Sequence, residues 1–386
     1  MNNIKNQLIC GNCIDILKMV NNASIDLVYM DPPFFTQKRH SLTNKYDVEY
    51  SFSDKYCNLN EYLQLIKNSA IECKRVLKET GSVFVHCDKT AVHHLRHILD
   101  KIFGVNNFQS EIVWIYKRWS NSKKGLLNSH QTILFYSMSS KFNFNNIYTA
   151  YSETTNIDQI LQERARNRGG KTVYKTDEKG ELIHAKNKKG VPLSDVWDIP
   201  FLNPKAKERV GYPTQKPVAL LERIIKIASN EGDIVLDPFC GSGTTCVASK
   251  LNNRSYLGID ISPDAIELAN TRVEDMIVSE SKLLKLGKSA YIAKSDQELA
   301  ILRSINAIPV QRNSKIDGFI NDGLIPVRIQ KKDELLYDSA LLLSNYVVSK
   351  KMKYGVLIQT NIKDNPISFN CNLDNIKIAK SLNMQI

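Results

Sequence analysis

The segment SIDLVYMDPPFF, residues 24–35, predicts the centre of the fold. Its first half is short, apolar and rich in β-branched residues, and two prolines stop it, which predicts a buried strand that ends at Asp31. Ligands of open α/β sheets bind at such carboxyl ends, where Pro32 and Pro33 would hold a rigid loop. The Asp31 carboxylate and a proline carbonyl could accept the two N–H groups of a planar base, while Phe34 stacks on it. An ordinary Pro-Pro turn is the alternative.

Composition narrows the class of protein. The chain has 386 residues, 24% of them charged and 42% hydrophobic, which is ordinary for a soluble globular protein with one large or two medium domains. The formal charge of +12 is unusual and predicts a polyanionic partner, nucleic acid before an anionic membrane. No stretch reaches the length of a membrane span and the N-terminus leads into no long apolar segment, so we expect a cytoplasmic protein.

The eight cysteines are scattered along the chain, which favours a reducing compartment over a disulfide framework. Cys10 and Cys13 have the spacing of a zinc or redox pair, but no second pair of Cys or His lies at ligand spacing elsewhere in the sequence. We therefore expect a structural role for this pair and no metal site, with redox or metal chemistry as the alternative.

Strands and helices alternate along the first part of the chain. Apolar patterns predict strands at 7–11, 24–31, 82–86, 111–116 and 132–136, and helices at 61–78 and 90–103, the first of them ended by Gly81. This alternation predicts an α/β fold with a doubly wound, mostly parallel sheet.

Two polar segments carry clusters of positive charge. Residues 36–60 mix aromatic residues with basic ones, including Lys38 and Arg39, and could hold a phosphate backbone; a solvated loop is the alternative. Residues 140–209 break the strand–helix pattern, and apolar residues between turns, Trp197 among them, favour a small β-rich subdomain over a disordered insertion. Its basic residues suit contacts to DNA phosphates, and we assign to them Arg164, Arg166, Arg168, Lys171, Lys188 and Lys189.

A second ligand-binding pattern begins at residue 233. A strand at 233–237 opens into PFCGSGTT at 238–245 and a helix, and the next strand ends at Asp260. Glycines let a ligand approach the backbone at a helix N-terminus, and the second acidic residue can hydrogen-bond a ribose diol. A P-loop would need Lys where Thr244 stands, and a dinucleotide fold would need a third glycine and no carboxylate at Asp237. The acidic rim favours a cationic cofactor, and S-adenosylmethionine fits best.

The motifs DPPF at 31–34, QKP at 215–217 and DPFCGSGTT at 237–245, with the basic insertion between them, resemble those of the amino DNA methyltransferases. Their order is that of the permuted β group of this family, in which the catalytic motif and the target-recognition domain precede the cofactor motifs. The resemblance covers about residues 7–279. It implies a Rossmann-like methyltransferase domain at 1–280, a target-recognition insertion at 140–209, and double-stranded DNA as the substrate.

The resemblance also implies roles for single residues. The flipped base would be held by Asp31, Pro32, Pro33 and Phe34 as the catalytic group. The cofactor would be bound by Asn12, Lys216, Pro217, Asp237, Phe239, Gly241, Gly243, Thr244 and Asp260. Two positions depart from the family pattern, because Asn12 stands where relatives usually have Asp and Gln131 stands where Glu is common.

An exocyclic amine is a poor nucleophile because its lone pair is delocalised into the ring. Hydrogen bonds to Asp31 and a proline carbonyl would favour a pyramidal nitrogen that attacks the sulfonium methyl in line. Methylation at cytosine C5 would need a cysteine nucleophile after a proline, and the sequence has no Pro-Cys pair. Asp at the first motif position resembles the adenine-N6 enzymes; cytosine N4 is the alternative, and RNA or a protein glutamine is a more distant one.

Residues 281–386 predict a separate small α/β domain. A helix at 296–305, strands at 315–320, 325–330 and 354–358, and an apolar helix through 341–343 faintly resemble the restriction-endonuclease-like fold, whose Asp and Glu/Gln-x-Lys pair bind metal. Asp317 is present, but Arg328-Ile329-Gln330 lacks the Lys and Gln330-Lys331-Lys332 lies at the strand's end. This favours a degenerate domain that aids DNA binding or dimerisation over one that cleaves.

A homodimer and a cognate restriction endonuclease are the further partners that this organisation suggests. The rival function is a DNA-binding or nuclease protein in which the methylase part acts as a cofactor sensor. Binding of the cofactor without turnover on any DNA would favour that rival.

Overall fold

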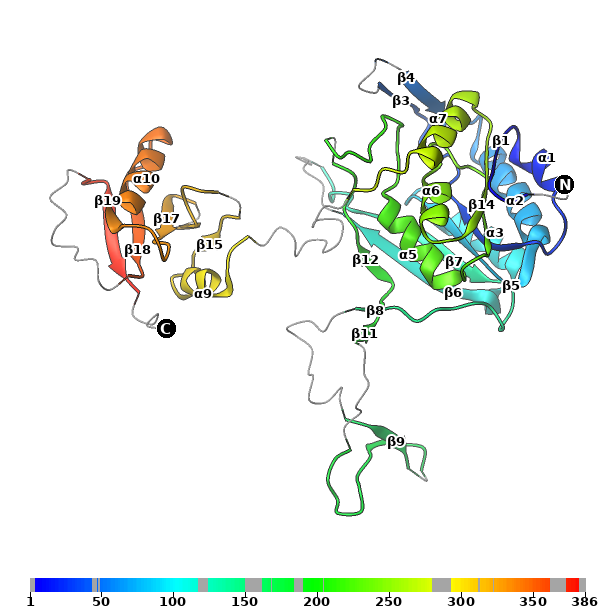
Figure 1. Ribbon diagram of the computed structural model, residues 1–386. Helices are drawn as coiled ribbons and strands as arrows, with labels where there is room; N and C mark the ends of the chain where they lie inside the picture. The colour runs from blue at the N-terminus through cyan, green and yellow to red at the C-terminus, as the bar shows by residue number, and fades with distance from the viewer. Residues whose placement is uncertain are drawn as a thin grey trace. The chain divides into compact units, whose positions relative to one another are not determined.

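The computed structural model describes residues 4–43, 47, 49–116, 124–149, 162–167, 169–183, 190–203, 205–279, 293–311, 313–321, 323–361 and 373–381. The chain divides into two compact units, residues 1–285 and 286–386, where the sequence predicted a boundary at 280/281. Each unit has its own sheet and its own helices (Figure 1). Among the described residues, no helix is long and apolar enough to cross a membrane.

The first unit is built on an eight-stranded sheet. In spatial order its strands are β1 (Gln7–Cys10), β14 (Ser255–Asp260), β13 (Ile234–Asp237), β2 (Ile25–Met30), β5 (Leu77–Cys87), β7 (His130–Ser137), β6 (Phe108–Ile115) and β12 (Val196–Asp198). Neighbouring strands are parallel, except that β7 runs antiparallel to both β5 and β6. The sheet is therefore mostly parallel, as the alternating pattern predicted.

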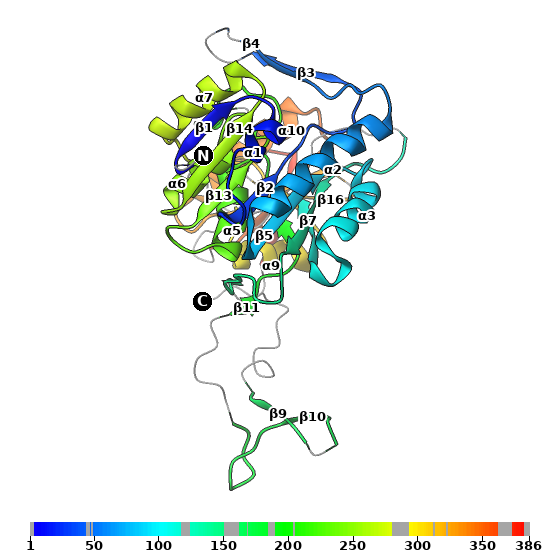
Figure 2. The same ribbon diagram turned by 90° about the vertical axis from the view of Figure 1, so that its right-hand side faces the viewer.

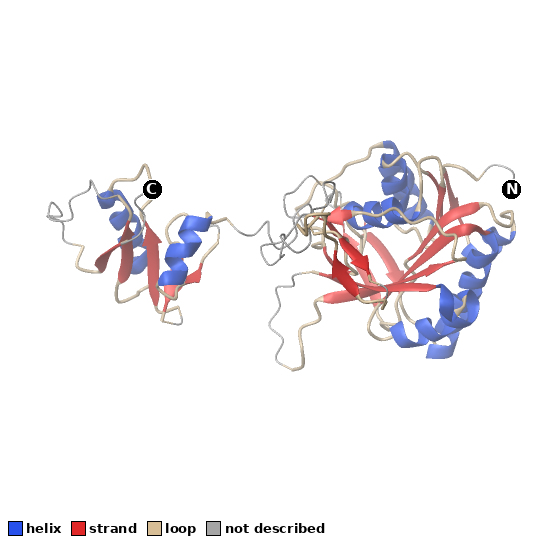
Figure 3. Cartoon of the chain, turned by 90° about the horizontal axis from the view of Figure 1, so that it is seen from below, coloured by secondary structure: helices blue, strands red, loops and turns tan. Residues whose placement is uncertain are grey.

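Helices cover both faces of this sheet (Figures 2 and 3). One face packs against α1 (Cys13–Lys18), α2 (Leu59–Val76) and α3 (Val92–Phe103). A short 3-10 helix, η1 (Val105–Asn107), follows α3 in the chain. The other face packs against α5 (Val218–Ala228), α6 (Thr244–Leu251) and α7 (Pro263–Glu274). Because both faces are covered, the central strands are apolar throughout; β2, for example, is buried at every residue.

The direction of the chain reverses at the centre of the sheet, between β2 and β13. From β2 the chain passes through α2 to β5 on one side, whereas from β13 it passes through α6 to β14 on the other. At such a switch point a crevice opens outside the carboxyl ends of the strands. Asp31 follows β2 directly, Asp237 ends β13 and Asp260 ends β14, so the topology brings three carboxylates to one edge.

The predicted end of the first long helix was wrong. We expected the helix to run to residue 78 and Gly81 to stop it, but α2 ends at Val76 and Gly81 lies inside β5. A Cβ at Gly81 would lie 3.0 Å from the carbonyl oxygen of Asp26 on the neighbouring strand, where the pairing of β2 with β5 shifts register. The glycine therefore permits close approach of two strands and does not cap a helix.

The segment at 36–60 forms a hairpin where a solvated loop was the alternative expectation. Its strands are β3 (Arg39–Thr43) and β4 (Glu49–Ser53), paired antiparallel. Arg39 pairs with Ser53 in the register of the hairpin, and its side chain donates a hydrogen bond to the hydroxyl of Ser51 at 3.0 Å. The interleaved polar and aromatic residues of this segment thus follow strand periodicity.

The predicted insertion is only partly a separate structure. Its strands β8 (Tyr148–Thr149) and β11 (Val191–Pro192) pair with each other, as do β9 (Arg164–Arg166) and β10 (Thr172–Tyr174). Trp197 was expected in the insertion, but it lies on β12, which extends the main sheet beside β6, and its side chain is 2% exposed. Arg168, Lys188 and Lys189 lie outside the described residues.

The second unit has a five-stranded sheet in the order β15 (Ile308–Pro309), β16 (Gly318–Ile320), β17 (Ile325–Ile329), β18 (Gly355–Gln359) and β19 (Ile376–Lys380). The first three strands are antiparallel neighbours and the last three are parallel. Separate apolar clusters join the sheet to α9 (Asp296–Ser304) and to α10 (Leu336–Ser349). The second unit therefore combines helices with a mixed sheet.

Candidate active site

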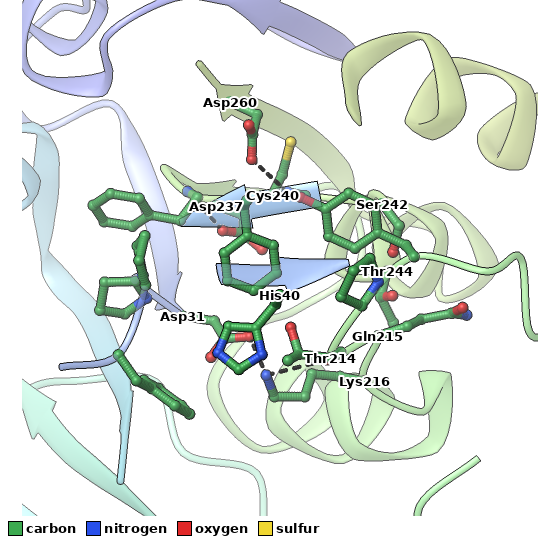
Figure 4. A pocket seen from close by; sticks show the side chains of 18 of the residues that line it. Asp31, His40, Thr214, Gln215, Lys216, Asp237, Cys240, Ser242, Thr244 and Asp260 are labelled. Carbon is green, nitrogen blue, oxygen red and sulfur yellow. Dashed lines mark hydrogen bonds and ion pairs between the residues drawn. The ribbon is translucent and has the colours of Figure 1, made fainter. Parts of the chain in front are cut away.

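A cavity of about 620 Å³ lies at the carboxyl ends of β2, β13 and β14. Ligand pockets commonly have about 300–1,000 Å³, so a nucleotide-sized ligand can be accommodated. Both motifs that the sequence singled out contribute to its lining, with Asp31, Pro32, Pro33 and Phe34 from the first and Asp237, Phe239, Gly241 and Thr244 from the second. In Figure 4, Asp237 lies between Asp31 and Asp260, which places the three carboxylates in succession along the cavity.

Asp31 forms an ion pair with Lys216. Lys216 Nζ donates a hydrogen bond to Asp31 Oδ2, lies 3.5 Å from the carbonyl oxygen of Thr214, and lies 5.6 Å from the centre of the Phe34 ring. The Lys216 side chain is 7% exposed and that of Asp31 is 18% exposed. The sequence grouped Lys216 with the cofactor residues, whereas the structure places its ammonium on the carboxylate of the first motif.

Behind Asp31 lies a buried imidazole that sequence reasoning did not identify. His86 on β5 has no exposed surface; its Nδ1 lies 2.7 Å from the hydroxyl of Tyr29 and 3.7 Å from Asp31 Oδ1, and its Nε2 lies 3.0 Å from Gln131 Oε1. Burial lowers the pKa of His86 to about 3, although Asp31 acts in the opposite direction. The ring is therefore neutral at physiological pH, with Nε2–H donating to Gln131 and Nδ1 accepting from Tyr29.

Asp237 is a buried carboxylate beside the glycine loop. Thr245 Oγ1 donates to Asp237 Oδ2 at 2.5 Å, and the backbone N–H of Phe239 donates to Oδ1 at 3.0 Å. Burial raises the pKa of Asp237 to about 7 despite these hydrogen bonds, and repulsion by Asp31 and Asp260 adds to the rise. A cationic ligand group beside Asp237 would favour its ionised form, which agrees with the expected cationic cofactor.

Backbone groups fix the carboxylate of Asp260. The N–H of Gly241 donates to its Oδ2 at 2.8 Å and the N–H of Ser262 donates to its Oδ1 at 2.9 Å, while burial raises its pKa. A carboxylate has about four acceptor positions, so Asp260 keeps capacity for a ribose hydroxyl. Asn12 caps α1 with its side chain and lines the same cavity.

Two predicted cofactor residues shape the site without lining it. Gly241 and Gly243 have φ angles of 48° and 73°, but Gly241 lines the cavity and Gly243 does not. A Cβ at Gly243 would lie 2.7 Å from the Cβ of Ala269, so this glycine permits α6 and α7 to pack closely. Pro217, also outside the lining, is the N-cap residue of α5 and fixes the chain directly after Lys216.

The β3–β4 hairpin supplies cavity residues that sequence reasoning missed. Thr36 Oγ1 donates to Asp54 Oδ2 at 2.8 Å, and His40 Nε2 lies 3.1 Å from the same oxygen. Phe52 stacks on Tyr212, with ring centres 6.2 Å apart and an interplanar angle of 17°. The mixture of aromatic and polar residues at 36–60 marked the segment, but only contacts between distant parts of the chain determine which side chains face the cavity.

The described residues assigned to DNA binding are exposed and lie outside the cavity lining. Lys38 and Arg39 lie at the start of the β3–β4 hairpin, and the β9–β10 hairpin and its turn carry Arg164, Arg166 and Lys171. The guanidinium of Arg164 lies 5.5 Å from the centre of the Tyr174 ring on β10. These positions provide positive charge at the surface, as phosphate contacts require.

The second unit contains its own cluster of carboxylates and lysines. Asp317 Oδ1 accepts hydrogen bonds from Lys294 and, at 2.9 Å, from Lys331, while its Oδ2 accepts the backbone N–H of Ile329 at 2.7 Å. Lys331 also bonds Glu298 on α9. Within the described residues, no group of three His, Cys, Asp or Glu side chains is arranged to hold a metal ion.

A family of known proteins resembles this chain over the region that contains the two cavity motifs. Residues 25–271, more than half of the chain, match the family model described as DNA methylase. The chain is 34% identical to the type II methyltransferase M.HpaI of Haemophilus parainfluenzae, over 69% of this chain and 74% of that protein. It is 29% identical to M.HinfI of Haemophilus influenzae, over 72% and 70%, and 30% identical to the DNA adenine methyltransferase YhdJ of Escherichia coli (strain K12), over 69% and 82%. Since the matched residues contain both motifs of the cavity, this chain belongs to the DNA methylase family.

Proposed function

We propose that this protein transfers a methyl group from S-adenosylmethionine to the exocyclic amine of a flipped-out base at a specific site in double-stranded DNA, with adenine N6 as the target. The observation that carries the proposal is one cavity that contains Asp31 and Phe34 together with Asp237 and Asp260. A base and a cofactor bound to these residues meet inside that cavity.

The second motif fits the cofactor. S-adenosylmethionine supplies a methyl group carried on a sulfonium. Asp260 can accept a ribose hydroxyl, Gly241 lines the cavity, and a cation beside Asp237 favours the ionised form of that carboxyl group. The remaining predicted cofactor residues that line the cavity are Asn12, Phe239 and Thr244.

The first motif fits a planar base with an amine. Asp31 and a carbonyl of the Pro32-Pro33 loop accept the two N–H groups, and Phe34 stacks on the ring, which offsets part of the cost of about a few kcal/mol for removing the base from the duplex. These hydrogen bonds favour a pyramidal nitrogen and orient its lone pair. Positioning and electrostatics therefore carry the reaction, and no covalent bond to the protein forms.

Adenine is the favoured base for two reasons. Asp31 at the first motif position resembles the adenine-N6 enzymes, and one relative of the chain is named as a DNA adenine methyltransferase. Cytosine N4 is the alternative, because the same acceptors can hold its amine.

The surface charges suit contacts with DNA phosphates outside the cavity. We assign this role to the exposed residues Lys38, Arg39, Arg164, Arg166 and Lys171. We assign residues 286–386 a non-catalytic part in DNA binding or dimerisation, because the ammonium groups of Lys294 and Lys331 occupy Asp317. A homodimer and a cognate restriction endonuclease belong to the same proposal.

The test is nucleoside mass spectrometry on methylation-free DNA incubated with the protein and S-adenosylmethionine. N6-methyladenine formed by the wild type and absent with Asp31→Ala supports the proposal, and N4-methylcytosine would change the base but keep the mechanism. If no modified nucleoside forms although calorimetry shows cofactor binding, the proposed activity on DNA is wrong. Sequencing of the modified DNA then identifies the recognition site.

A further inference from the structure

The ammonium of Lys216 lies at the position that the amine of the target base would take in the proposed reaction. Its Nζ is hydrogen-bonded to Asp31 Oδ2 and lies 5.6 Å from the centre of the Phe34 ring. Asp31 and Phe34 are the two side chains that would hold the target base by its amine and by its ring face. The lysine thus fills the carboxylate contact and lies beside the ring that would stack on the base.

The other oxygen of Asp31 does not offer an equal place for the amine. Asp31 Oδ1 lies 3.7 Å from Nδ1 of His86, a ring with no exposed surface. This oxygen therefore faces the buried wall formed by His86, Tyr29 and Gln131. Oδ2, which Lys216 holds, is the oxygen through which an amine in the cavity can reach the carboxylate.

Hydrogen bonds hold the backbone beside Lys216, whereas its side chain borders the cavity. Gln215 accepts the N–H of Val210 at 3.0 Å and donates to the carbonyl of Glu208 at 2.8 Å, and the Glu208 carboxylate accepts the N–H of Val218 at 2.7 Å. These bonds anchor the backbone on both sides of Lys216. The side chain itself is a flexible four-carbon stem, so the ammonium can leave Asp31 without moving the chain.

We propose that, in the substrate-free protein, Lys216 occupies the position of the target amine on Asp31, and that the base binds productively only after this ammonium has left. The inference rests on the proposed function and deepens it. It reassigns Lys216 from the cofactor to the base position, and it makes base entry depend on what drives the lysine away.

The chemistry of methyl transfer requires the lysine to leave. The amine nitrogen forms a bond to the methyl carbon, the carbon–sulfur bond breaks with its electron pair left on sulfur, and the nitrogen keeps one proton too many. Asp31 is placed to take that proton, but the ammonium of Lys216 already fills the oxygen that faces the amine. The sulfonium must also lie in line with the amine, so its positive charge approaches Lys216 and repels it from Asp31.

The experiment measures whether the protein senses the amine of the base before the cofactor binds. Two duplexes carry the mapped recognition site. One has adenine at the target position and the other has purine, which lacks the amine. Cytosine and 2-pyrimidinone replace them if N4-methylcytosine is the product. Dissociation constants are measured for each duplex without cofactor and with sinefungin, an unreactive cofactor analogue that carries an amine in place of the sulfonium methyl.

The proteins compared are the wild type, Lys216→Met, Lys216→Arg and Lys89→Met. Lys216→Arg keeps a cation on Asp31. Lys89 is a second lysine of the cavity lining, and its Nζ donates to Asn128 Oδ1 at 3.3 Å, so Lys89→Met removes a positive charge that does not lie on Asp31. Thermal unfolding of each variant checks that it is folded.

Purine pairs more weakly with thymine than adenine does and is flipped out more easily, so the measured quantity is the adenine-over-purine affinity ratio of each protein relative to that of the wild type. Without cofactor, Lys216→Arg and Lys89→Met should keep the wild-type ratio within about twofold. Lys216→Met should shift the ratio towards adenine by about tenfold, the usual size of one hydrogen bond to a charged group. With sinefungin, the wild-type ratio should shift by the same factor.

Three results would overturn the inference. The first is a folded Lys216→Met whose adenine-over-purine ratio equals that of the wild type. The second is a wild-type ratio that does not shift towards adenine when sinefungin is added. The third is a Lys216→Met that loses sinefungin binding and leaves the adenine preference unchanged, which would return Lys216 to the cofactor. Each of these is compatible with methyl transfer by the wild type, so the inference can fail while the proposed function stands.

Discussion

Each unit of the chain contains a carboxylate bonded to lysine, and the two differ in what else can reach it. Asp317 is 2% exposed and holds Lys294, Lys331 and the N–H of Ile329. Asp31 is 18% exposed, holds Lys216 and borders a cavity of about 620 Å³. A carboxylate that is buried among its partners supports structure, whereas one that borders a cavity can exchange its lysine for a ligand.

The pKa values follow the same contrast. Burial alone would raise the pKa of Asp317, but the hydrogen bonds from Ile329, Lys294 and Lys331 outweigh it and lower the pKa. In the cavity, by contrast, Asp237 has its pKa raised to about 7, because burial and two neighbouring carboxylates outweigh its hydrogen bonds. The Asp317 cluster is therefore stabilised by its own lysines, whereas the carboxylates around Asp237 would be stabilised by a bound cation.

The largest expected effect is a loss of methyl-transfer activity on substitution of Asp31 but not of Asp317. Asp31→Ala should lower the rate of methyl transfer by at least about 100- to 1,000-fold, the cost of removing one preorganised transition-state contact. Asp317→Ala should leave the rate within about twofold of the wild type. Rates are measured with radiolabelled cofactor on DNA containing the recognition site, and calorimetry should show that Asp31→Ala still binds the cofactor. A large loss of rate in Asp317→Ala would mean that the second unit takes part in catalysis.

The next largest expected effect is a loss of stability of the second unit on substitution of Asp317. Asp317→Ala leaves the 7% exposed Lys294 without its partner, and removal of one member of a buried pair costs about 3–5 kcal/mol. Hydrogen exchange should show faster exchange in residues 286–386 and unchanged exchange in the first unit. The double variant Asp317→Ala/Lys294→Met should recover part of the loss. Exchange that is unchanged in all three proteins would show that the cluster contributes no stability.

The third expected effect is a pH dependence of cofactor binding. A cationic ligand binds the ionised form of Asp237, whose pKa is about 7 in the free protein. Affinity for S-adenosylmethionine should therefore fall as the pH falls below about 7, approaching tenfold per pH unit, and should level off above about 8. Calorimetry between pH 6 and 8.5 measures this, and Asp237→Asn should bind more weakly with a flat profile. A sloping profile in Asp237→Asn would assign the titration to another group.

The raised pKa of Asp237 also has a consequence for the free protein. Because the folded state holds this proton at pH values where the unfolded chain has released it, the contribution of Asp237 to stability decreases as the pH rises from about 4 to about 7. Bound cofactor should remove this dependence. Chemical denaturation with and without S-adenosylmethionine over that range provides the measurement.

The smallest expected effect comes from making the cavity resemble the second cluster. Gln131→Glu places a carboxylate 3.0 Å from His86 Nε2, which should raise the pKa of His86 by about 1–3 units from its present value of about 3. A charged His86 would hold Asp31 Oδ1, 3.7 Å away, as the lysines hold Asp317. The rate relative to the wild type should be near one at pH 8 and should fall by up to about twofold at pH 6, because a pKa of about 6 leaves half of the His86 rings neutral at that pH. Gln131→Met serves as a control that adds no charge, and an equal fall in both variants would point to packing.

Local sequence gave the elements of the first unit and the motifs of its site. The strand that ends at Asp31 and the glycine loop after Asp237 were predictable, because apolar runs, prolines and glycines act over a few residues. The end of α2 was wrong, because Gly81 has a role that depends on Asp26 of a neighbouring strand. Trp197 was misplaced for a similar reason, since its partner strand β6 lies more than 80 residues earlier in the chain.

The residue types of the site were determined by the sequence alone, and their relations to one another were determined by the tertiary structure. The sequence identified Asp31, Asp237 and Asp260 and the chemistry they permit, since motif spacing encodes local geometry. It could not place the Lys216 ammonium on Asp31, 185 positions away, or identify His86 behind them. Such contacts depend on how β2, β5 and the start of α5 pack together. This packing is determined by the whole fold and not by the sequence around each of the two contacting residues.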